Sequence, residues 1–336
     1  MTAALNDVSI IIVTYQGDEL TKNCLDSLAA TCGSEPQIVV VDNSPSETTR
    51  RIAAEYPNAV YVPSPGNPGF AGGNNRALPF CDRRYVLLLN NDTIVHSRES
   101  IAGLVRFLEE HPKCGAVQGS GRLYPSGTIA GCGSWLTPLG FMWSPGFNAK
   151  EHPLFGEAHP CFMGGGFFLM FRRCDIAKVG GFLFRSAFWC YYEETDFCHR
   201  LLLAGMEVWY APTVPIDHLC SQTSGRFRWS DIMRRHLRNL LFSLKANLSF
   251  ASRLRILPFV YSLIVGHALF HFLKGDFPTA KSDFAALAAS RRDKKRILAA
   301  RRQVSRIRKV TDRQIFKTAM KHPPLKDLLR YVRGNM

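Results

Sequence analysis

Short apolar runs alternate with helical patterns along the first 110 residues, and this alternation restricts the fold more than any other feature of the chain. Runs rich in β-branched or aliphatic residues at 8–14, 37–42, 59–62 and 85–90 have the composition of strands buried on both faces. Helical spacing of apolar residues follows each of them, at about 18–30, 46–56, 69–80 and 97–110. This order predicts an α/β fold with a mostly parallel sheet and helices on both faces.

Polar side chains follow three of these strands at the point where each strand ends. They are Thr14 and Tyr15 after the first strand, Asp42 and Asn43 after the second, and Asn90, Asn91 and Asp92 after the fourth. In open α/β sheets the ligand lies at the carboxyl ends of the strands, where such residues meet. Either aspartate alone is more simply a turn or cap residue, but the two at one edge favour a binding site.

A glycine-rich segment, NPGFAGGNNRAL, occupies residues 67–78. Gly69, Gly72 and Gly73 would let the backbone approach a ligand closely, and the following helix offers free N–H groups to an anion. The spacing is not G-x-G-x-x-G, so the segment carries no dinucleotide-binding fingerprint. A flexible loop is the simpler alternative for this segment.

The chain changes character after residue 115. Residues 115–160 are rich in Gly, Pro, Trp and Phe without clear periodicity, which predicts an irregular region that shapes a cleft. A strand at 167–171 and a short helix follow, and then aromatic residues at 188–192 precede Glu193, Glu194 and Asp196. Acidic residues suit a helix start, which is the simpler explanation. A carboxylate beside an aromatic wall would instead have a raised pKa and act as a general base.

The net charge of +15 is concentrated at one end of the chain. Residues 226–336 contain 26 Lys+Arg and 6 Asp+Glu, a net of +20, whereas residues 1–225 have a net of −5. This asymmetry indicates that the basic segment meets a polyanion. The stretch 256–273 contains 18 uncharged residues, which is close to the minimum length of a spanning helix. Pro258, Gly266, His267 and His271 make it less suited to span a bilayer. We therefore expect basic amphipathic helices that lie in the membrane interface.

Other interpretations of the basic segment are a buried helical hairpin, a homodimer interface, or a nucleic-acid-binding helix at 291–309. No base-reading motif accompanies it, so we expect no nucleic-acid partner. Ten scattered cysteines without metal-ligand spacing indicate reduced thiols and a cytosolic setting. The N-terminal residues lack a basic region and an apolar stretch, so we expect no signal peptide.

The ordered set of motifs resembles the family-2 glycosyltransferases, most closely their bacterial rhamnosyltransferase-like branch. The matching segments are IIIVTYQG, VVVDNSPSE, GNPGFAGGNNRAL, LLLNNDTIV, GGGFFLMFRR, EETDFCHR and DHLCSQTSG, in the family's order across about residues 8–225. The resemblance implies a GT-A fold at 1–225, with a nucleotide-sugar half at about 1–115 and an acceptor and catalytic half at about 116–225. It also implies a divalent cation, Mg²⁺ or Mn²⁺, and inversion at the anomeric carbon.

The same resemblance implies roles for particular residues. Asp92 matches the last carboxylate of the family's D-x-D motif and would bind the cation, with His218 completing the site. The residues implied in donor binding are Thr14, Tyr15, Asp42, Asn43, Gly72, Asn75, Asn90 and Asn91. Among these, Asp42 would accept a hydrogen bond from the N3–H group of uracil or thymine.

The family's catalytic motif is commonly E-D-x-D, and this chain has Glu193-Glu194-Thr195-Asp196. Glu194 aligns with the general base, and Asp196 and Glu193 are the other candidates. The implied reaction moves a sugar, L-rhamnose from dTDP-rhamnose, onto a hydroxyl of a lipid-linked glycan in O-antigen or cell-wall synthesis. It would take place at the inner face of the cytoplasmic membrane, with the protein peripherally attached. UDP-galactofuranose or a UDP-hexose are the alternative donors, and a nucleotidyltransferase or a non-catalytic basic binding protein are the less favoured functions.

Overall fold

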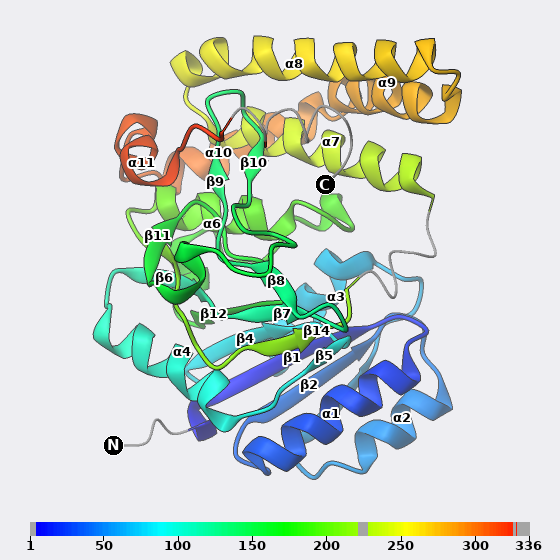
Figure 1. Cartoon of the computed structure of the whole chain (residues 1–336), viewed down its shortest axis with the longest axis vertical. Coiled ribbons are helices and arrows are strands. Elements are labelled where there is room, and N and C mark those ends of the chain that lie inside the picture. The colour runs from blue at the N-terminus through cyan, green and yellow to red at the C-terminus, as the bar shows by residue number, and fades with distance from the viewer. Residues whose placement is uncertain (1–4, 221–227, 325–326, 328–336) are drawn as a thin grey trace.

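The computed structural model describes residues 5–220, 228–324 and 327. Figure 1 shows two parts: a sheet with flanking helices, and a stack of C-terminal helices that covers one end of it. The expected boundary between them, at residues 225 and 226, lies outside the described residues, as does the end of the DHLCSQTSG motif.

A mixed sheet of eight strands forms the centre of the first part. The strands lie in the order β11-β13-β6-β12-β4-β1-β2-β3. Their bounds are β1 (Val8–Thr14), β2 (Gln37–Asp42), β3 (Ala59–Pro63), β4 (Tyr85–Leu89), β6 (Cys114–Gln118), β11 (His159–Cys161), β12 (Phe168–Arg172) and β13 (Glu207–Tyr210). Strands β4, β1, β2 and β3 are parallel, as is the pair β6 and β13. The predicted mostly parallel sheet is therefore confirmed, with antiparallel β12 between β4 and β6 and antiparallel β11 at one edge.

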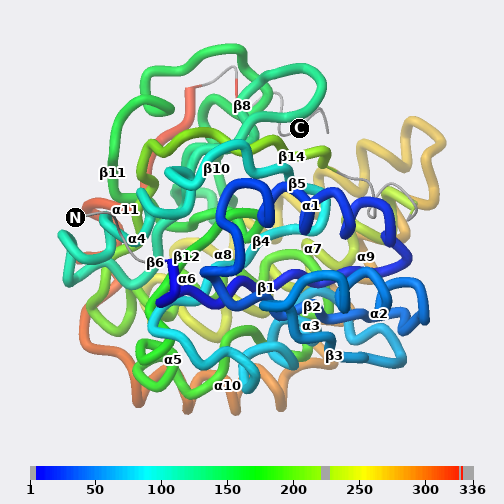
Figure 2. The backbone as a smooth tube through the Cα atoms, turned by 90° about the horizontal axis from the view of Figure 1, so that it is seen from below, coloured from blue at the N-terminus to red at the C-terminus, as the bar shows by residue number. Residues whose placement is uncertain are grey.

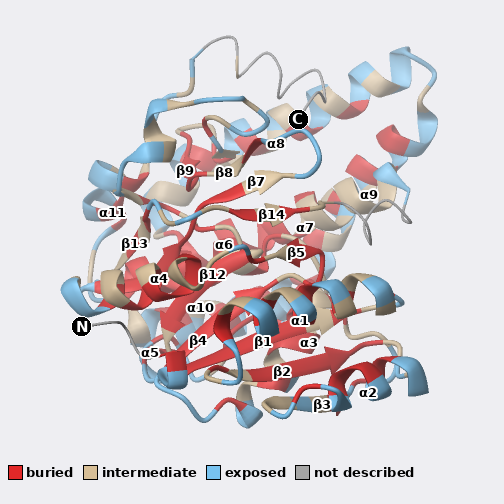
Figure 3. Cartoon of the chain, turned by 60° about the horizontal axis from the view of Figure 1, so that its bottom comes forward, coloured by how far each residue is buried: buried red, intermediate tan, exposed pale blue. Residues whose placement is uncertain are grey.

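Helices cover both faces of this sheet (Figure 2). On one face lie α1 (Asp18–Cys32), α2 (Glu47–Ala54) and α4 (Arg98–Glu110), and on the other α3 (Gly69–Ala77) and α6 (Glu193–Leu203). Alternation along β1 separates the two cores, because Ile10 and Ile12 pack with α1 while Ile11 packs with α3. Serine side chains cap two of these helices, since Ser46 accepts a hydrogen bond from the Thr49 N–H and Ser97 accepts one from the Glu99 N–H. Figure 3 shows the buried sheet between helices with exposed outer faces.

The segment expected to be irregular folds into short strands and turns. A second sheet has the order β5-β14-β7-β8, formed by β5 (Thr93–Ile94), β14 (Ile216–His218), β7 (Gly121–Leu123) and β8 (Thr128–Gly131). A hairpin joins β9 (Trp135–Leu136) to β10 (Met142–Trp143). The remaining short elements are η1 (Leu5–Asp7), η2 (Leu78–Phe80), η3 (Pro153–Gly156), α5 (Asp175–Lys178) and η4 (Ser186–Phe188). Because His218 pairs with Thr93 in the second sheet, it lies next to the end of β4.

The basic segment folds into helices that pack on the first part. They are α7 (Trp229–Asn247), α8 (Phe250–Leu273), α9 (Phe277–Arg292), α10 (Lys294–Ile307) and α11 (Asp312–Ala319). Helix α7 packs against α6 and α9, and α9 also packs against α8. Helix α8 is outermost in Figure 1 and buries only one stripe of apolar residues. That stripe contains Ile256, Val260, Ile264 and Ala268, whose spacing of four residues defines one helix face.

Candidate active site

A cavity of about 400 Å³ opens at the carboxyl edge of the sheet. The strand ends contribute six of the residues predicted to meet there: Thr14, Tyr15, Asn43, Asn90, Asn91 and Asp92. Other walls come from the start of α3, the loop before β12, the start of α6, the end of β14 and the first turns of α7. The cavity thus joins elements from both halves of the sheet and from the C-terminal helices.

Asp92 and His218 lie next to one another in the wall of this cavity. The Nε2 atom of His218 lies 3.3 Å from Oδ1 of Asp92, and that oxygen is buried without a hydrogen-bond partner among the described residues. The ring of Phe167 stacks on the imidazole with 4.7 Å between ring centres. An orphaned carboxylate oxygen beside a histidine nitrogen fits a divalent cation whose other ligands are water and substrate phosphates. The described residues contain no cluster of three or more His, Cys, Asp or Glu suited to a metal, so water and phosphate oxygens would have to supply the other ligands.

A network of neutral side chains holds the strand ends in place. The amide nitrogen of Asn91 donates to the hydroxyls of Thr14 and Thr21 at 3.2 and 3.3 Å, and Thr21 donates to Thr14 at 2.9 Å. Asn43 donates to the carbonyl of Gly69 at 3.0 Å, which joins β2 to the start of α3. The Oδ1 atom of Asn43 is buried and has no partner among the described residues, so it can accept a hydrogen bond from a ligand N–H.

Three residues predicted to bind the donor lie outside the lining of this cavity. The carboxylate of Asp42 accepts the backbone N–H groups of Ser44 and Ser46 at 2.9 and 3.0 Å, so it caps the turn after β2. A Cβ on Gly72 would lie 2.5 Å from Pro68 Cβ, which explains the glycine by packing.

Asn75 makes paired hydrogen bonds with the backbone of Phe184, donating to its carbonyl at 2.7 Å and accepting from its N–H at 2.9 Å. The amide therefore ties α3 to the segment before η4. For Asp42, Gly72 and Asn75 the role in donor binding stays a prediction.

Glu193 and Glu194 both line the cavity at the start of α6. The Oε2 atom of each carboxyl is buried and lacks a hydrogen-bond partner among the described residues. Burial raises the pKa of both carboxyls, and the neighbouring Glu194 raises the pKa of Glu193 further. A carboxyl with a raised pKa at the wall of a cavity is suited to proton transfer near neutral pH.

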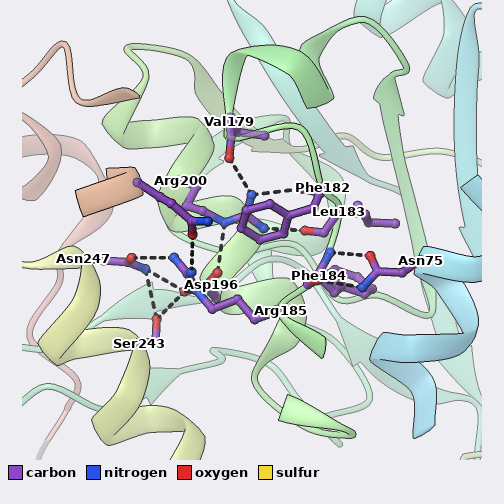
Figure 4. Close-up of polar contacts among 11 residues, drawn as sticks. Asn75, Val179, Phe182, Leu183, Phe184, Arg185, Asp196, Arg200, Ser243 and Asn247 are labelled. Atoms are coloured by element: carbon purple, nitrogen blue, oxygen red, sulfur yellow. Dashed lines mark hydrogen bonds and ion pairs between the residues drawn. The ribbon is translucent and has the colours of Figure 1, made fainter. Parts of the chain in front are cut away.

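Asp196 lies in a different environment, shown in Figure 4. It is fully buried, outside the cavity lining, and its two oxygens accept from Arg185 Nε at 3.0 Å and Arg200 Nε at 2.9 Å. Asn247 of α7 donates to the same carboxylate at 2.9 Å. Burial opposes ionisation, but the two guanidinium groups outweigh it and lower the pKa of Asp196 to about 2. Asp196 therefore joins α6 to the C-terminal helices as a permanent anion.

The loop before Glu193 has an unusual backbone. Trp189, Tyr191 and Tyr192 have φ angles of 61°, 71° and 73°, in the left-handed region that bulky residues rarely adopt. Trp189 and Tyr191 line the cavity, so an aromatic wall does stand beside the acids. The side-chain nitrogen of Asn239 on α7 contacts the carbonyls of Phe188, Cys190 and Tyr191 at 3.0, 3.1 and 2.8 Å. These contacts hold the strained loop in position.

The sequence analysis did not predict the α7 residues at this site, because it expected the basic helices to lie in the membrane interface. Asp231, Ile232 and Arg235 line the cavity, and Asn239 supports its loop. A signal was present, because Asn239, Ser243 and Asn247 recur every four residues among leucines. A stripe of polar residues on the apolar face of a helix indicates buried hydrogen bonds.

Comparison with solved structures agrees with this architecture and identifies the class of fold. The chain superposes on the mannosyltransferase PcManGT from Pyrobaculum calidifontis, solved in complex with GDP-Man and Mn²⁺, with a TM-score of 0.53 and 17% identity. The match covers 86% of this chain and 88% of that one. The fold is therefore that of the GT-A glycosyltransferases.

Comparison with protein families identifies the group within that class. Residues 9–175 match the model of "Glycosyl transferase family 2", and the chain belongs to this family. The hexosyltransferase Agl10 of low-salt glycan biosynthesis in Haloferax volcanii is 27% identical over 227 residues, covering 64% of this chain and 67% of its own. The N-acetylglucosaminyl-diphospho-decaprenol L-rhamnosyltransferase of Mycobacterium tuberculosis is 25% identical over 257 residues, covering 69% and 82%.

Proposed function

We propose that this glycosyltransferase moves a sugar from a nucleotide donor onto a hydroxyl of a lipid-linked glycan with inversion, using Glu194 as the general base. One observation carries the proposal: the Glu194 carboxyl, with a raised pKa and an unpartnered oxygen, lines the same cavity as Asp92 and His218. The base and the leaving-group site of a transferase must both border the space where the sugar is bound.

The reaction is a single displacement at the anomeric carbon. Glu194 takes the proton of the acceptor hydroxyl while the oxygen of that hydroxyl forms the new bond to the anomeric carbon. The bond from the carbon to the diphosphate oxygen breaks, the nucleoside diphosphate leaves with the electron pair, and the configuration inverts. Asp92 and His218 would hold Mg²⁺ or Mn²⁺, which would neutralise charge on the leaving diphosphate. Asp196 has no part in this step because two arginines occupy its carboxylate.

The donor we propose is dTDP-L-rhamnose. The supporting observation is the similarity to the mycobacterial L-rhamnosyltransferase over 69% of this chain. A hexosyltransferase is similar over a comparable length, so UDP-galactofuranose and UDP-hexoses are the alternative donors. The name of the mycobacterial relative also supports a lipid-diphosphate-linked acceptor.

We further propose that helix α8 rests on the inner face of the cytoplasmic membrane. Of the described helices it alone is long and apolar enough to cross a bilayer, with a mean hydropathy of 1.8, and 22% of that window is buried. Exposed side chains along it include Phe250, Leu254, Phe259, Leu269, Phe272 and Leu273. Because one stripe of α8 packs inside the protein and the segment carries a net charge of +20, binding along the surface of an anionic bilayer is favoured over spanning.

A donor screen tests the proposed reaction. Release of nucleoside diphosphate is measured for several dTDP- and UDP-sugars with Mn²⁺ or Mg²⁺ and a lipid-linked acceptor, and Asp92→Ala is the inactive control. Cation-dependent release from one donor, lost in the variant, is the expected result and names the sugar. Release of pyrophosphate would instead indicate a nucleotidyltransferase, and the absence of cation-dependent nucleotide binding would refute the proposal.

A further inference from the structure

A second hollow, of about 300 Å³, lies between α7, α9 and the segment around η4. Its charged walls are Arg234, Arg235 and Arg238 of α7 and Arg292 of α9. Ala285 and Ala289 of α9 also line it, and their small side chains leave space between the guanidinium groups. We call this feature the arginine hollow.

Positive charge in the arginine hollow exceeds the negative charge that faces it. Arg234 pairs with Asp231 at 3.2 Å, and Arg238 pairs with Asp293 at 2.8 Å. For Arg235 and Arg292 the structure gives no carboxylate within ion-pair distance among the described residues. Among the described residues, two cations of the hollow therefore form no ion pair, an arrangement that a bound anion would stabilise.

The guanidinium group of Arg235 lies close to other groups that line the arginine hollow. Its guanidinium lies over the Trp189 ring, 4.1 Å from the ring centre, and it also lines the larger cavity. Burial lowers the pKa of Arg235, and the neighbouring Arg234 lowers it further. Arginines that lie this close together repel one another, and such a cluster indicates a ligand of opposite charge. Phosphate is a suitable ligand, because planar guanidinium groups bind its oxygens in pairs.

The arginine hollow lies between the cavity lined by Glu194 and the apolar surface of α8 and α9. On one side it shares Trp189 and Arg235 with the cavity that holds Glu194. On the other side, α9 packs along α8 and carries the exposed apolar residues Phe277 and Phe284. An amphipathic molecule with its lipid at the α8 and α9 surface can therefore place an anionic group in the hollow and a sugar in the cavity.

We propose that the arginine hollow binds the diphosphate that joins the acceptor sugar to its lipid. This inference rests on the proposed transferase function. It assigns acceptor recognition to α7 and α9 and places it outside the GT-A sheet. The lipid-diphosphate would then fix the distance between the membrane surface and Glu194, so that only the first sugars of the acceptor reach the base.

The test uses the full-length protein in detergent and farnesyl diphosphate as the probe, measured by calorimetry at low salt. Arg234 and Arg292 are the residues to change, because both side chains are exposed and neither donates a hydrogen bond to the backbone of the described residues. The double variant R234Q/R292Q should bind farnesyl diphosphate about tenfold or more weakly, since charge-assisted hydrogen bonds to phosphate are lost. R291Q is the control for R292Q, because each removes one positive charge and Arg291 lies outside the lining of the hollow, and R291Q should bind like the wild type.

Three further measurements separate the sources of the anion. R234K/R292K should recover part of the affinity, because lysine keeps the charge but loses the paired geometry. Equal affinity in wild type and R234Q/R292Q would overturn the proposal. The proposal would also be overturned if R234Q/R292Q lost binding to phosphatidylglycerol vesicles but still bound farnesyl diphosphate, because the hollow would then bind lipid headgroups. Nucleoside diphosphate binding with Mn²⁺ to the wild type tests the larger cavity separately, and its absence would remove the transferase function without removing the diphosphate site.

Discussion

The side-chain nitrogen of Asn239 donates a hydrogen bond of 2.8 Å to the carbonyl oxygen of Tyr191. Tyr191 lies in the left-handed loop that leads directly into Glu193 and Glu194, whereas Asn239 lies in the middle of α7. A helix from the basic end of the chain therefore positions the carboxyls at the sheet edge. The C-terminal helices therefore form part of the candidate active site as well as the proposed membrane contact.

The first prediction concerns this contact. Asn239→Asp keeps the size of the side chain but removes the donor and places a carboxylate against carbonyl oxygens. The loop should relax and turnover should fall about a hundredfold, because small displacements of a catalytic group have effects of that size. Turnover is compared with that of Asn58→Asp, which loses a similar bond to the Pro36 carbonyl far from the cavity. An equal loss in both variants would mean that Asn239 has no specific role.

Replacement of the proposed base is the second prediction. Glu194→Gln retains the shape of the side chain but cannot accept the acceptor proton, so kcat should fall by about 10²–10⁴. Cation-dependent nucleotide binding, measured by calorimetry, should persist because the donor site is untouched. Glu110→Gln, at the exposed end of α4, is the control and should retain wild-type turnover. A fully active Glu194→Gln enzyme would exclude this base.

The third prediction concerns pH. Burial raises the pKa of Glu193 and Glu194 above the ordinary value of 4.5, so the folded protein binds more protons than the unfolded chain. Their contribution to stability is complete below pH 4.5 and is lost as pH rises through the folded-state pKa values. Glu193→Gln should therefore raise the free energy of unfolding by about 1–2 kcal/mol at pH 8 and change it little at pH 4.

The same pKa shifts affect the rate. Because the base must be deprotonated, the acid limb of the profile of kcat/KM against pH should lie above pH 4.5. Denaturant titrations at pH 4 and pH 8 measure the effect on stability. Initial rates between pH 4 and 9 measure the effect on kcat/KM. A Glu193→Gln variant that is equally stabilised at pH 4 and pH 8 would show that ionisation is not the cause.

Cation binding is the fourth prediction. Asp92→Asn removes the carboxylate that we propose binds the cation next to His218, so Mn²⁺-dependent nucleotide binding should weaken tenfold or more. Asp217→Asn is a matched control, because Asp217 precedes His218 on β14 and pairs with His96 at 2.8 Å, outside the cavity. Calorimetry with and without Mn²⁺ compares the variants. The assignment fails if Asp92→Asn and Asp217→Asn bind the nucleotide equally well with Mn²⁺.

The exposed face of α8 provides the fifth prediction. Phe259 and Leu269 are 53% and 51% exposed, and the double change to serine should weaken binding to anionic vesicles at least about tenfold. Phe80→Ser, which alters a residue that is 46% exposed on η2, should have no effect on sedimentation with vesicles. Unchanged sedimentation of the α8 variant would exclude this face as the membrane contact.

Local physical chemistry was sufficient to predict the framework. The run of aliphatic residues at Val86–Leu89 is buried in the sheet, and Ser46 and Ser97 cap the helices that follow them. These features depend on neighbours within a few residues, so they can be inferred from the chain alone. The rule that strand ends form the ligand edge also correctly brought Thr14, Asn43 and Asp92 into one cavity.

The use of each polar side chain depended on partners distant in sequence. Asp42 and Asp92 both follow a strand, yet Asp42 caps a turn while Asp92 keeps an unpartnered oxygen in the cavity. Glu194 and Asp196 are two residues apart, but only Asp196 meets two arginines and Asn247.

The sequence by itself thus determined the strands, the helix starts and the residue types at the sheet edge, because each follows from local propensity and periodicity. The tertiary structure decided that β12 runs antiparallel between β4 and β6 and that α7 supports the loop before Glu193. The physical reason is that burial and long-range hydrogen bonding set the ionisation and availability of a side chain, and both depend on which segments pack together.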